Sequence, residues 1–150
     1  MSLFDGKRLD NETFKLDIDR MRKGWYTDKY FTNIMIMLEN LSKLKQPYSG
    51  SKSRIPEHLH DEKIITGDIE VEMQWFTRRQ GHTIVVGVDK ALTMLQHCCG
   101  YWKEDKFIDT SANLKVWAIQ DGCKVFSDGD PLNVKPVIRV QGRYRDFAIL

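Results

Sequence analysis

The sequence predicts a single α+β domain over residues 1–150, with a mixed or antiparallel sheet, one long helix and one short helix. Three observations support this: an apolar period of three and four residues over 27–45, alternation of apolar and polar residues over 68–77, and short β-like runs separated by turns after residue 114. A chain of 150 residues can form one domain with a moderate core.

The composition is that of a folded protein. Hydrophobic residues make up 41% and charged residues 29% of the chain, which is typical of globular and not of disordered proteins. The net charge of +2 is too small to predict nucleic-acid or membrane binding by itself. No apolar run approaches the roughly 20 residues that span a bilayer, and "MSLFDGKRLD" lacks the apolar core of a signal peptide. We therefore predict a cytoplasmic protein.

The three cysteines are Cys98, Cys99 and Cys123. An odd number that includes an adjacent pair argues against a disulfide framework, so we expect reduced and mostly packed thiols. His97 precedes Cys98, but neighbouring side chains on a helix point about 100° apart, so direct activation of the thiol is not expected.

Residues 1–23 are charged and weakly periodic, and we interpret them as a polar arm. A helix is predicted over 27–45, ended by Pro47 and Gly50. Its main apolar face consists of Tyr26, Tyr30, Ile34, Met37, Leu41 and Leu44. Phe31, Met35 and Leu38 widen this face, so we expect the helix to be largely covered.

The start of this helix combines a polar cap with aromatic residues. Thr27 is a plausible N-cap, which would place Asp28 in the first turn, where the helix dipole favours negative charge. The period alone predicts that Tyr30 belongs to the core. The alternative is that its ring faces a ligand.

Residues 46–66 form a polar connection. Within it, "EHLHDE" at 57–62 contains His58 and His60, which would share one face of an extended strand and could ligate a metal. No third ligand lies at a fixed spacing, so a solvated loop is the favoured interpretation.

The run "DIEVEMQWFT" predicts a strand with one buried and one wet face. The buried face consists of Ile69, Val71, Met73 and Trp75. "RRQGH" then turns the chain, and "TIVVGV" at 83–88 predicts a strand buried on both faces. Asp89 can cap the short helix "KALTMLQHCC", which Gly100 closes.

The C-terminal third returns to a β pattern. Residues 101–112 form a polar, aromatic connection, followed by strands in 114–120, 123–126 and 134–142 with turns between them. The chain stops in the apolar run "RYRDFAIL", which we interpret as a cut within an element or at a domain junction.

Two groups of arginines are candidates for binding anions. Arg78 and Arg79 follow the first strand beside a Gly turn, where two guanidiniums can hold a carboxylate or phosphate, the alternative being a solvated rim. The second group, with Tyr144 among its members, is a minor option for nucleic acid. It comprises Arg139, Arg143 and Arg145. No phosphate loop, G-x-G-x-x-G or C-x-x-C motif is present.

In order along the chain, "YTDKYF" (26–31), "GDIEVEMQWFTRRQ", "TIVVGVDKALTML" and "VWAIQDGCKVFSDGDPLNVKPVIRVQGRYRDFAIL" resemble the N-terminal domain of nicotinate phosphoribosyltransferases, within the type II phosphoribosyltransferase superfamily. In this family Thr-Asp-x-Tyr is a signature. The chain departs from the pattern at Gln80-Gly81, where a Pro and an aromatic are more usual.

The resemblance implies an N-terminal α+β domain that precedes a catalytic α/β barrel, and that barrel is not present in these 150 residues. Tyr30 would stack on the pyridine ring of nicotinate in the partner subunit's active site. Asp28 would support substrate binding there, and Arg78 or Arg79 would meet a carboxylate or phosphate.

By resemblance, the full enzyme would join nicotinate to 5-phosphoribosyl pyrophosphate, with ATP and magnesium, in NAD biosynthesis. It would be a homodimer or other homo-oligomer, with neither nucleic acid nor membrane as a partner. The fragment alone would bind no cofactor, contribute no catalytic residue or metal ligand, and be inactive. The alternative function is a non-catalytic binding or oligomerisation module.

Overall fold

The structure is a computed structural model, and it describes residues 8–51, 53, 57, 60, 63–130 and 132–150. In chain order the helices and strands are α1 (Ile18–Arg22), α2 (Lys29–Lys43), β1 (Glu70–Phe76), β2 (Gly81–Ile84), α3 (Val88–Cys98), β3 (Gly100–Lys103), β4 (Lys106–Asp109), β5 (Lys115–Ala118), β6 (Lys124–Ser127), β7 (Pro136–Arg143) and α4 (Tyr144–Phe147). Short 3-10 turns are η1 (Asn11–Thr13), η4 (Thr66–Asp68) and η5 (Ser111–Asn113).

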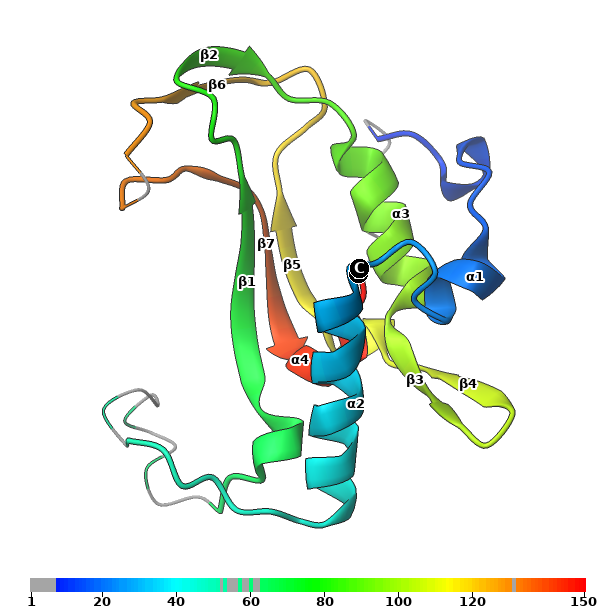
Figure 1. The fold of residues 1–150 in the computed structure, drawn as a ribbon. Coiled ribbons are helices and arrows are strands. Elements are labelled where there is room, and N and C mark those ends of the chain that lie inside the picture. The colour runs from blue at the N-terminus through cyan, green and yellow to red at the C-terminus, as the bar shows by residue number, and fades with distance from the viewer. Residues whose placement is uncertain (1–7, 52, 54–56, 58–59, 61–62, 131) are drawn as a thin grey trace.

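The main sheet has the strand order β1-β7-β5, and both neighbouring pairs are antiparallel. The helices α2 and α3 lie on the same side of this sheet (Figure 1). Two further antiparallel pairs, β2-β6 and β3-β4, stand outside it. The described residues therefore form an α+β fold with antiparallel sheets and no closed barrel, which confirms the predicted fold class at this coarser level.

The alternation predicted for the first strand is confirmed in β1. Val71 and Met73 pack against the core, whereas Glu70 and Glu72 are exposed on the opposite face. Successive side chains of a strand point to opposite faces of the sheet. Here the helices cover one face, so the apolar side chains of β1 pack there and the polar ones are in contact with solvent.

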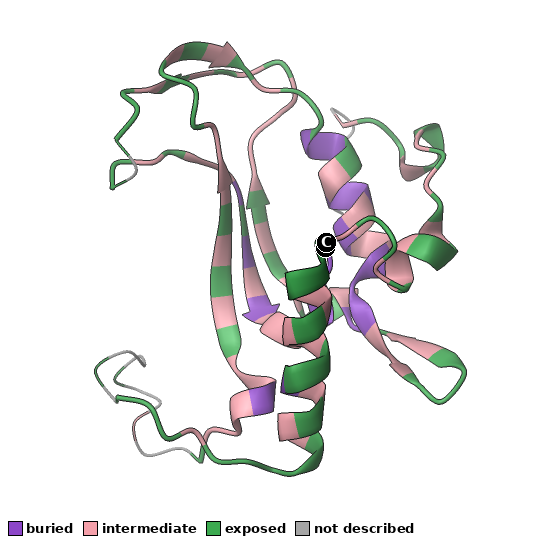
Figure 2. Ribbon diagram, viewed as in Figure 1, coloured by how far each residue is buried: buried purple, intermediate pink, exposed green. Residues whose placement is uncertain are grey.

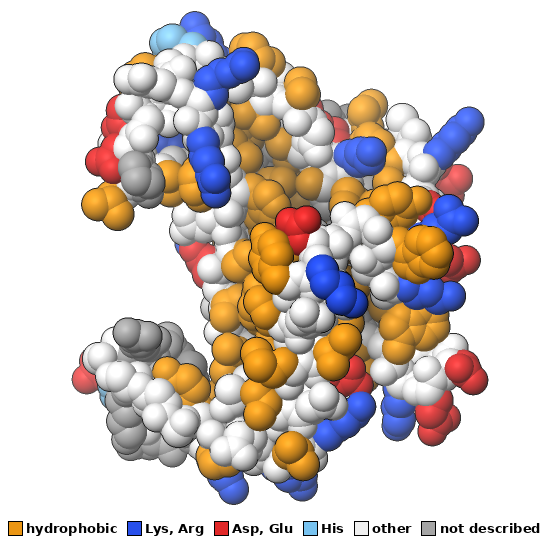
Figure 3. Space-filling model, in the orientation of Figure 1, with side chains coloured by type: hydrophobic (Ala, Val, Ile, Leu, Met, Phe, Trp, Pro, Cys, Tyr) orange, Lys and Arg blue, Asp and Glu red, His pale blue; other side chains and the backbone are white. Residues whose placement is uncertain are grey.

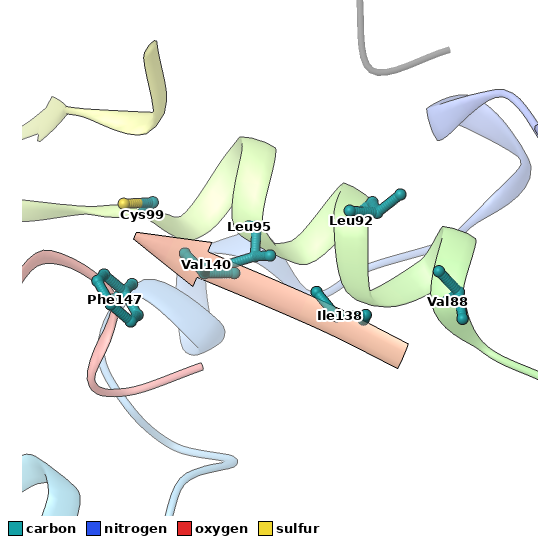
Figure 4. Packing of buried hydrophobic residues seen from close by; sticks show 7 residues of the cluster. All are labelled: Val88, Leu92, Leu95, Cys99, Ile138, Val140 and Phe147. Atoms are coloured by element: carbon teal, nitrogen blue, oxygen red, sulfur yellow. The ribbon is translucent and has the colours of Figure 1, made fainter. Parts of the chain in front are cut away.

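The core lies between α3, β7 and the C-terminal residues (Figure 4). Its buried members are Val88, Leu92, Leu95, Cys99, Ile138, Val140 and Phe147. Burial is concentrated in α3, β7 and the last turn, whereas α2 and β1 remain partly exposed (Figure 2). The centre of β7 therefore holds the sheet against α3.

The prediction that Asp89 caps α3 was wrong. Gly87 occupies the N-cap position with a φ of 93°, a left-handed conformation that glycine adopts without a Cβ penalty. The carboxylate of Asp121, from the turn between β5 and β6, accepts hydrogen bonds from the N–H groups of Val88 and Asp89 at 2.9 and 3.0 Å. A side chain distant in sequence thus supplies the cap.

Asp89 itself is buried and pairs with the N-terminal arm. Its carboxylate accepts a 2.8 Å bond from Arg8 and a 2.9 Å bond from the N–H of Leu9. Arg8 also donates to the carbonyls of Ala118 and Ile119. The described part of the arm, predicted only as polar, is therefore bonded to α3 and to the end of β5.

The helix α2 differs most from its predicted packing. Leu38 is its one buried residue, whereas Tyr30 and Met37 are 56% and 53% exposed. The expectation of a largely covered helix was wrong, because α2 packs against η4 and α4 and leaves its outer side to solvent. Gly67 of η4 lies so close to the carbonyl of Leu38 that a Cβ there would clash.

The segment predicted as a doubly buried strand was also assigned wrongly. The strand β2 starts at Gly81 and ends at Ile84, and both Ile84 and Val86 are more than half exposed, at 56% and 79%. It pairs only with β6, in a ribbon that projects beyond the main sheet (Figure 1). Of this segment, only Val85, which packs against the core, and Val88, which is buried as the first residue of α3, contribute to the core.

The region predicted as a connection over 101–112 contains the hairpin β3-β4. Its turn places Glu104 at a φ of 54°, a conformation that few non-glycine residues adopt. Trp102 and Phe107 face each other across the hairpin with ring centroids 5.5 Å apart. This aromatic pair stabilises two strands too short to stand alone.

Candidate functional site

The start of α2 is the strongest candidate for a binding site. Asp28, and not Thr27, is the N-cap residue, and its side chain is exposed and makes no capping hydrogen bond. Thr27 donates its hydroxyl instead to the carbonyl of Ile149, which ties the start of α2 to the end of the chain. The Asp28 carboxylate therefore faces solvent beside a fixed helix terminus.

Tyr30 is the second residue of α2 and is 56% exposed, so the prediction that it belongs to the core was wrong. Its ring packs against Phe31, with centroids 4.2 Å apart and planes tilted by 39°. Burial raises the pKa of the neighbouring Tyr144, and Tyr30 adds to that shift. The arrangement supports the Tyr30 ring on one side and leaves over half of the side chain accessible.

Arg78 and Arg79 lie in the segment that follows β1, and both are exposed. The N–H of Arg79 donates to the hydroxyl of Thr77 at 3.2 Å, which bends the backbone as the chain leaves the sheet. The end of β1 and the start of α2 are well separated (Figure 1). Within one chain, the structure therefore does not join the two arginines to Tyr30 and Asp28.

The histidine segment yields little. His58 lies outside the described residues. The backbone N–H of His60 donates a hydrogen bond to the carbonyl of Glu57. Among the residues that the structure describes, no group of three His, Cys, Asp or Glu side chains could hold a metal ion. The metal interpretation of "EHLHDE" therefore has no support in the described part of the chain.

The thiols of Cys98 and Cys99 are unsuited to nucleophilic chemistry. Cys98 and Cys99 are both 0% exposed, and burial raises the pKa of Cys98 above its ordinary value and that of Cys99 to about 12. The His97 ring contacts the side-chain amide of Asn11 at 3.2 Å. Because the thiolate is the reactive form, these cysteines act as core residues, as the sequence predicted.

The arginines considered for nucleic acid are all paired with carboxylates. Arg139 binds Glu72 at 2.7 Å, and Arg143 binds Asp146 at 2.8 Å. Arg145 binds Asp68 at 2.9 Å. These pairs neutralise the row of arginines, which argues against a basic surface at this place.

Asp68 is the centre of a polar network that sequence reasoning missed. Burial opposes its ionisation, but the Ser42 hydroxyl and the guanidiniums of Arg145 and Arg143 outweigh this and hold the pKa of Asp68 below its usual range. Arg143 and Arg145 also lie over the Tyr101 ring, with centroid distances of 5.4 and 5.3 Å. The partners are distant in sequence, so no local motif could have revealed this network.

The fold and the candidate site define an α+β protein with an exposed aromatic and acidic pair at one helix terminus. Comparisons with family models, curated proteins and solved structures found no match. No helix among the described residues is long and apolar enough to cross a membrane.

Proposed function

We propose that the chain is the N-terminal, substrate-capping and dimerisation domain of a nicotinate phosphoribosyltransferase-like enzyme. The proposal rests on the ordered resemblance given above. The observation that carries it further is that Tyr30 is exposed at the start of α2, where the Asp28 side chain, two residues earlier, makes no capping bond. A tyrosine with helical spacing but no place in the core is available to a ligand.

The chemistry of stacking suits this position. A pyridine ring can lie against the accessible side of Tyr30, and such stacking contributes about 0.5–1.5 kcal/mol beyond the burial of area. Asp28 can accept a hydrogen bond from the substrate at the same helix terminus. Nicotinate also carries a carboxylate, and Arg78 or Arg79 can bind such a group when a second subunit brings the two regions together.

The remaining chemistry is assigned to the barrel of the longer enzyme. There, nicotinate would displace pyrophosphate from 5-phosphoribosyl pyrophosphate to give nicotinate mononucleotide, assisted by ATP hydrolysis and magnesium. The described residues contain no group that could hold a metal ion. We assign no reaction step to these 150 residues, and we expect them alone to show no turnover in a steady-state assay with all substrates.

The direct test replaces Tyr30 by Leu in the enzyme that carries the barrel. Loss of stacking should raise the KM for nicotinate about three- to tenfold, corresponding to the stacking energy above, with the melting temperature unchanged. Tyr26→Leu is the matched control, because Tyr26 is 64% exposed at the same end of α2. Equal effects of the two substitutions, or turnover by the 150-residue chain alone, would contradict the proposal.

The second candidate function is a non-catalytic binding or oligomerisation module. The exposed apolar residues of α2 favour it, since large exposed apolar patches mark interaction surfaces. A stable oligomer that ignores nicotinate in a calorimetric titration would support the module. Binding that Tyr30→Leu weakens would support the enzyme domain.

A further inference from the structure

The helix α3 has a polar side that faces the N-terminal arm. Four polar residues share this side, because they follow one another four, three and one positions apart: Asp89, Thr93, Gln96 and His97. Asp89 and Thr93 are 3% and 1% exposed. The described part of the arm, residues 8–23, lies along this side (Figure 1) and contacts α3 through η1 and α1. The arm therefore covers polar groups of α3, while the apolar side of the helix packs in the core.

One side chain of the arm, Asn11, bonds to the C-terminal half of this polar side. Its amide nitrogen, Nδ2, donates a hydrogen bond to Oε1 of Gln96 at 2.8 Å and lies 3.2 Å from Nε2 of His97. Its amide oxygen accepts a bond from the Thr93 hydroxyl at 3.0 Å. An amide nitrogen only donates, so Nε2 of His97 is the acceptor, and the ring is neutral with its proton on Nδ1. These four side chains are here called the Asn11 clasp.

We propose that the Asn11 clasp is a pH-sensitive device, which holds the N-terminal arm on α3 while His97 is neutral and releases it when His97 is protonated. Histidine is the side chain whose charge ordinarily changes between about pH 5 and pH 8. Protonation turns Nε2 of His97 into a donor, which then faces the donor Nδ2 of Asn11 across the same 3.2 Å. Two opposed donors form no hydrogen bond, and opening of the clasp lets water accept from both.

The cations around the clasp oppose protonation of His97. Arg22 of α1 donates its Nε–H to the backbone carbonyl of His97 at 2.8 Å, so a positive charge already lies beside this residue. Lys23 and Lys90 are exposed. The turn η5, which also packs against α3, contains no charged residue.

The carboxylates of the surrounding elements are bonded to other groups or exposed. Asp10 accepts from the N–H of Glu12, Asp17 pairs with Arg20, Asp89 pairs with Arg8, and Asp109 accepts from Ser111. Glu12 and Asp19 are exposed, and charged side chains of both signs lie at the surface near α1 (Figure 3). No described carboxylate is therefore bonded to the ring of His97, where it would stabilise the protonated form.

Release of the clasp affects a limited segment. The ion pair between Arg8 and Asp89 precedes Asn11 in the arm, and the bond from Arg22 to α3 follows it. The segment between these two attachments, which includes η1, is the part that opens. Opening exposes the buried Thr93 hydroxyl and leaves the apolar side of α3 in the core. The inference does not rest on the nicotinate proposal, because none of these residues has an assigned part in that site.

Hydrogen exchange of the 150-residue chain between pH 8 and pH 5, corrected for the intrinsic exchange rate at each pH, tests the release. The amides of Thr13 and Phe14 bond to backbone carbonyls of the η1 turn. Their protection should fall about tenfold as the pH is lowered over this range. The Leu9 amide, which bonds to Asp89 outside the clasp, is the internal control and should keep its protection. Constant protection of Thr13 and Phe14 would show that the clasp tolerates a protonated His97 and would overturn the inference.

Two substitutions assign the effect to the clasp. His97→Gln keeps an acceptor that does not titrate, so the protection of η1 should stay at its pH 8 value throughout. Asn11→Asp replaces the opposed donor by a carboxylate, which pairs with a protonated His97, so the pH dependence should reverse and protection should be greater at pH 5 than at pH 8. If protection fell as steeply in His97→Gln as in the unsubstituted chain, or fell in Asn11→Asp, other groups would control the arm and the inference would be wrong.

Discussion

The helices α3 and α2 have similar amphipathic patterns, but the fold uses them in opposite ways. Six residues of α3 are buried, namely Val88, Asp89, Leu92, Thr93, Leu95 and Cys98. In α2, Leu38 alone is buried, although the helix has 15 residues. A periodic pattern therefore identifies which side chains share a face, but it does not determine whether another element covers that face.

The number of contacting elements explains the difference. The N-terminal arm, η5 and β7 all pack against α3, and Asp121, from the turn between β5 and β6, caps its first turn. The helix α2 is held mainly by η4 and α4. We therefore expect α3 to determine the stability of the domain and α2 to determine what the domain binds.

The largest expected effect is a difference in stability between a substitution in α3 and a matched substitution in α2. Leu92→Ala should lower the free energy of unfolding by about 3 kcal/mol, because Leu92 is 2% exposed and its removal leaves a cavity. Met37→Ala should change it by less than about 0.5 kcal/mol, because the side chain is 53% exposed. Denaturant unfolding of the monomer measures both, and equal losses would contradict the comparison.

Removal of Arg8 should have the next largest effect, because it leaves the buried Asp89 without its ion partner. Breaking a buried pair costs about 3–5 kcal/mol, but the arm can move aside and admit water, so we expect about 2 kcal/mol for Arg8→Ala. Glu39→Gln, which breaks the exposed pair on α2 with Lys43, is the control and should cost no more than about 0.5 kcal/mol. Thermal unfolding measures both variants. If Arg8→Ala lowered the melting temperature no more than Glu39→Gln does, the pairing of the arm with Asp89 would not contribute to stability.

The helix caps provide a third comparison. Asp121→Ala should destabilise the domain by about 1 kcal/mol, because it removes the acceptor for two N–H groups of α3. Asp28→Ala should lower the free energy of unfolding by only about 0.3 kcal/mol, since the Asp28 side chain makes no capping bond. Hydrogen exchange of the first-turn amides distinguishes the two: protection should fall in α3 and remain unchanged in α2.

Local sequence patterns predicted where the helices and strands lie better than they predicted which of their faces are buried. The alternation of "DIEVEMQWF" correctly predicted β1 and its two faces. Helices cover only one face of the sheet, so every second side chain of β1 packs against the core and the others are exposed. The continuous apolar run of "TIVVGV" had the opposite outcome. It resembles a buried strand, but β2 pairs only with β6 outside the main sheet.

The candidate site was predicted in part. The sequence located Asp28 and Tyr30 at the start of a helix, which the structure confirms, but the period assigned Tyr30 to the core. The cap of α3 by Asp121 and the ion pair between Arg8 and Asp89 join residues 32 and 81 positions apart. Such contacts follow from the tertiary fold, so no local spacing could reveal them.

The smallest expected effect concerns pH and the attachment of α2. The pKa of Asp68 is lowered in the folded state, despite burial, by Ser42, Arg145 and Arg143. Its contribution to stability is therefore fully present above its ordinary pKa of 3.8 and is lost as the pH falls through the lower, folded value.

Asp68→Asn should consequently destabilise the domain at neutral pH and show a smaller further loss of melting temperature than the unsubstituted chain between about pH 5 and pH 2. Other acidic groups also titrate in this range, so the informative quantity is the difference between the two curves. Glu72→Gln is the control on the exposed sheet face, where Arg139 lowers the pKa of Glu72 by a hydrogen bond. Because Asp68 joins η4 to α2 through Ser42, fluorescence of a probe on α2 should follow the Asp68 transition and ignore that of Glu72. If the curves of the Asp68→Asn variant and the unsubstituted chain stayed parallel, the carboxylate would not link α2 to the rest of the domain.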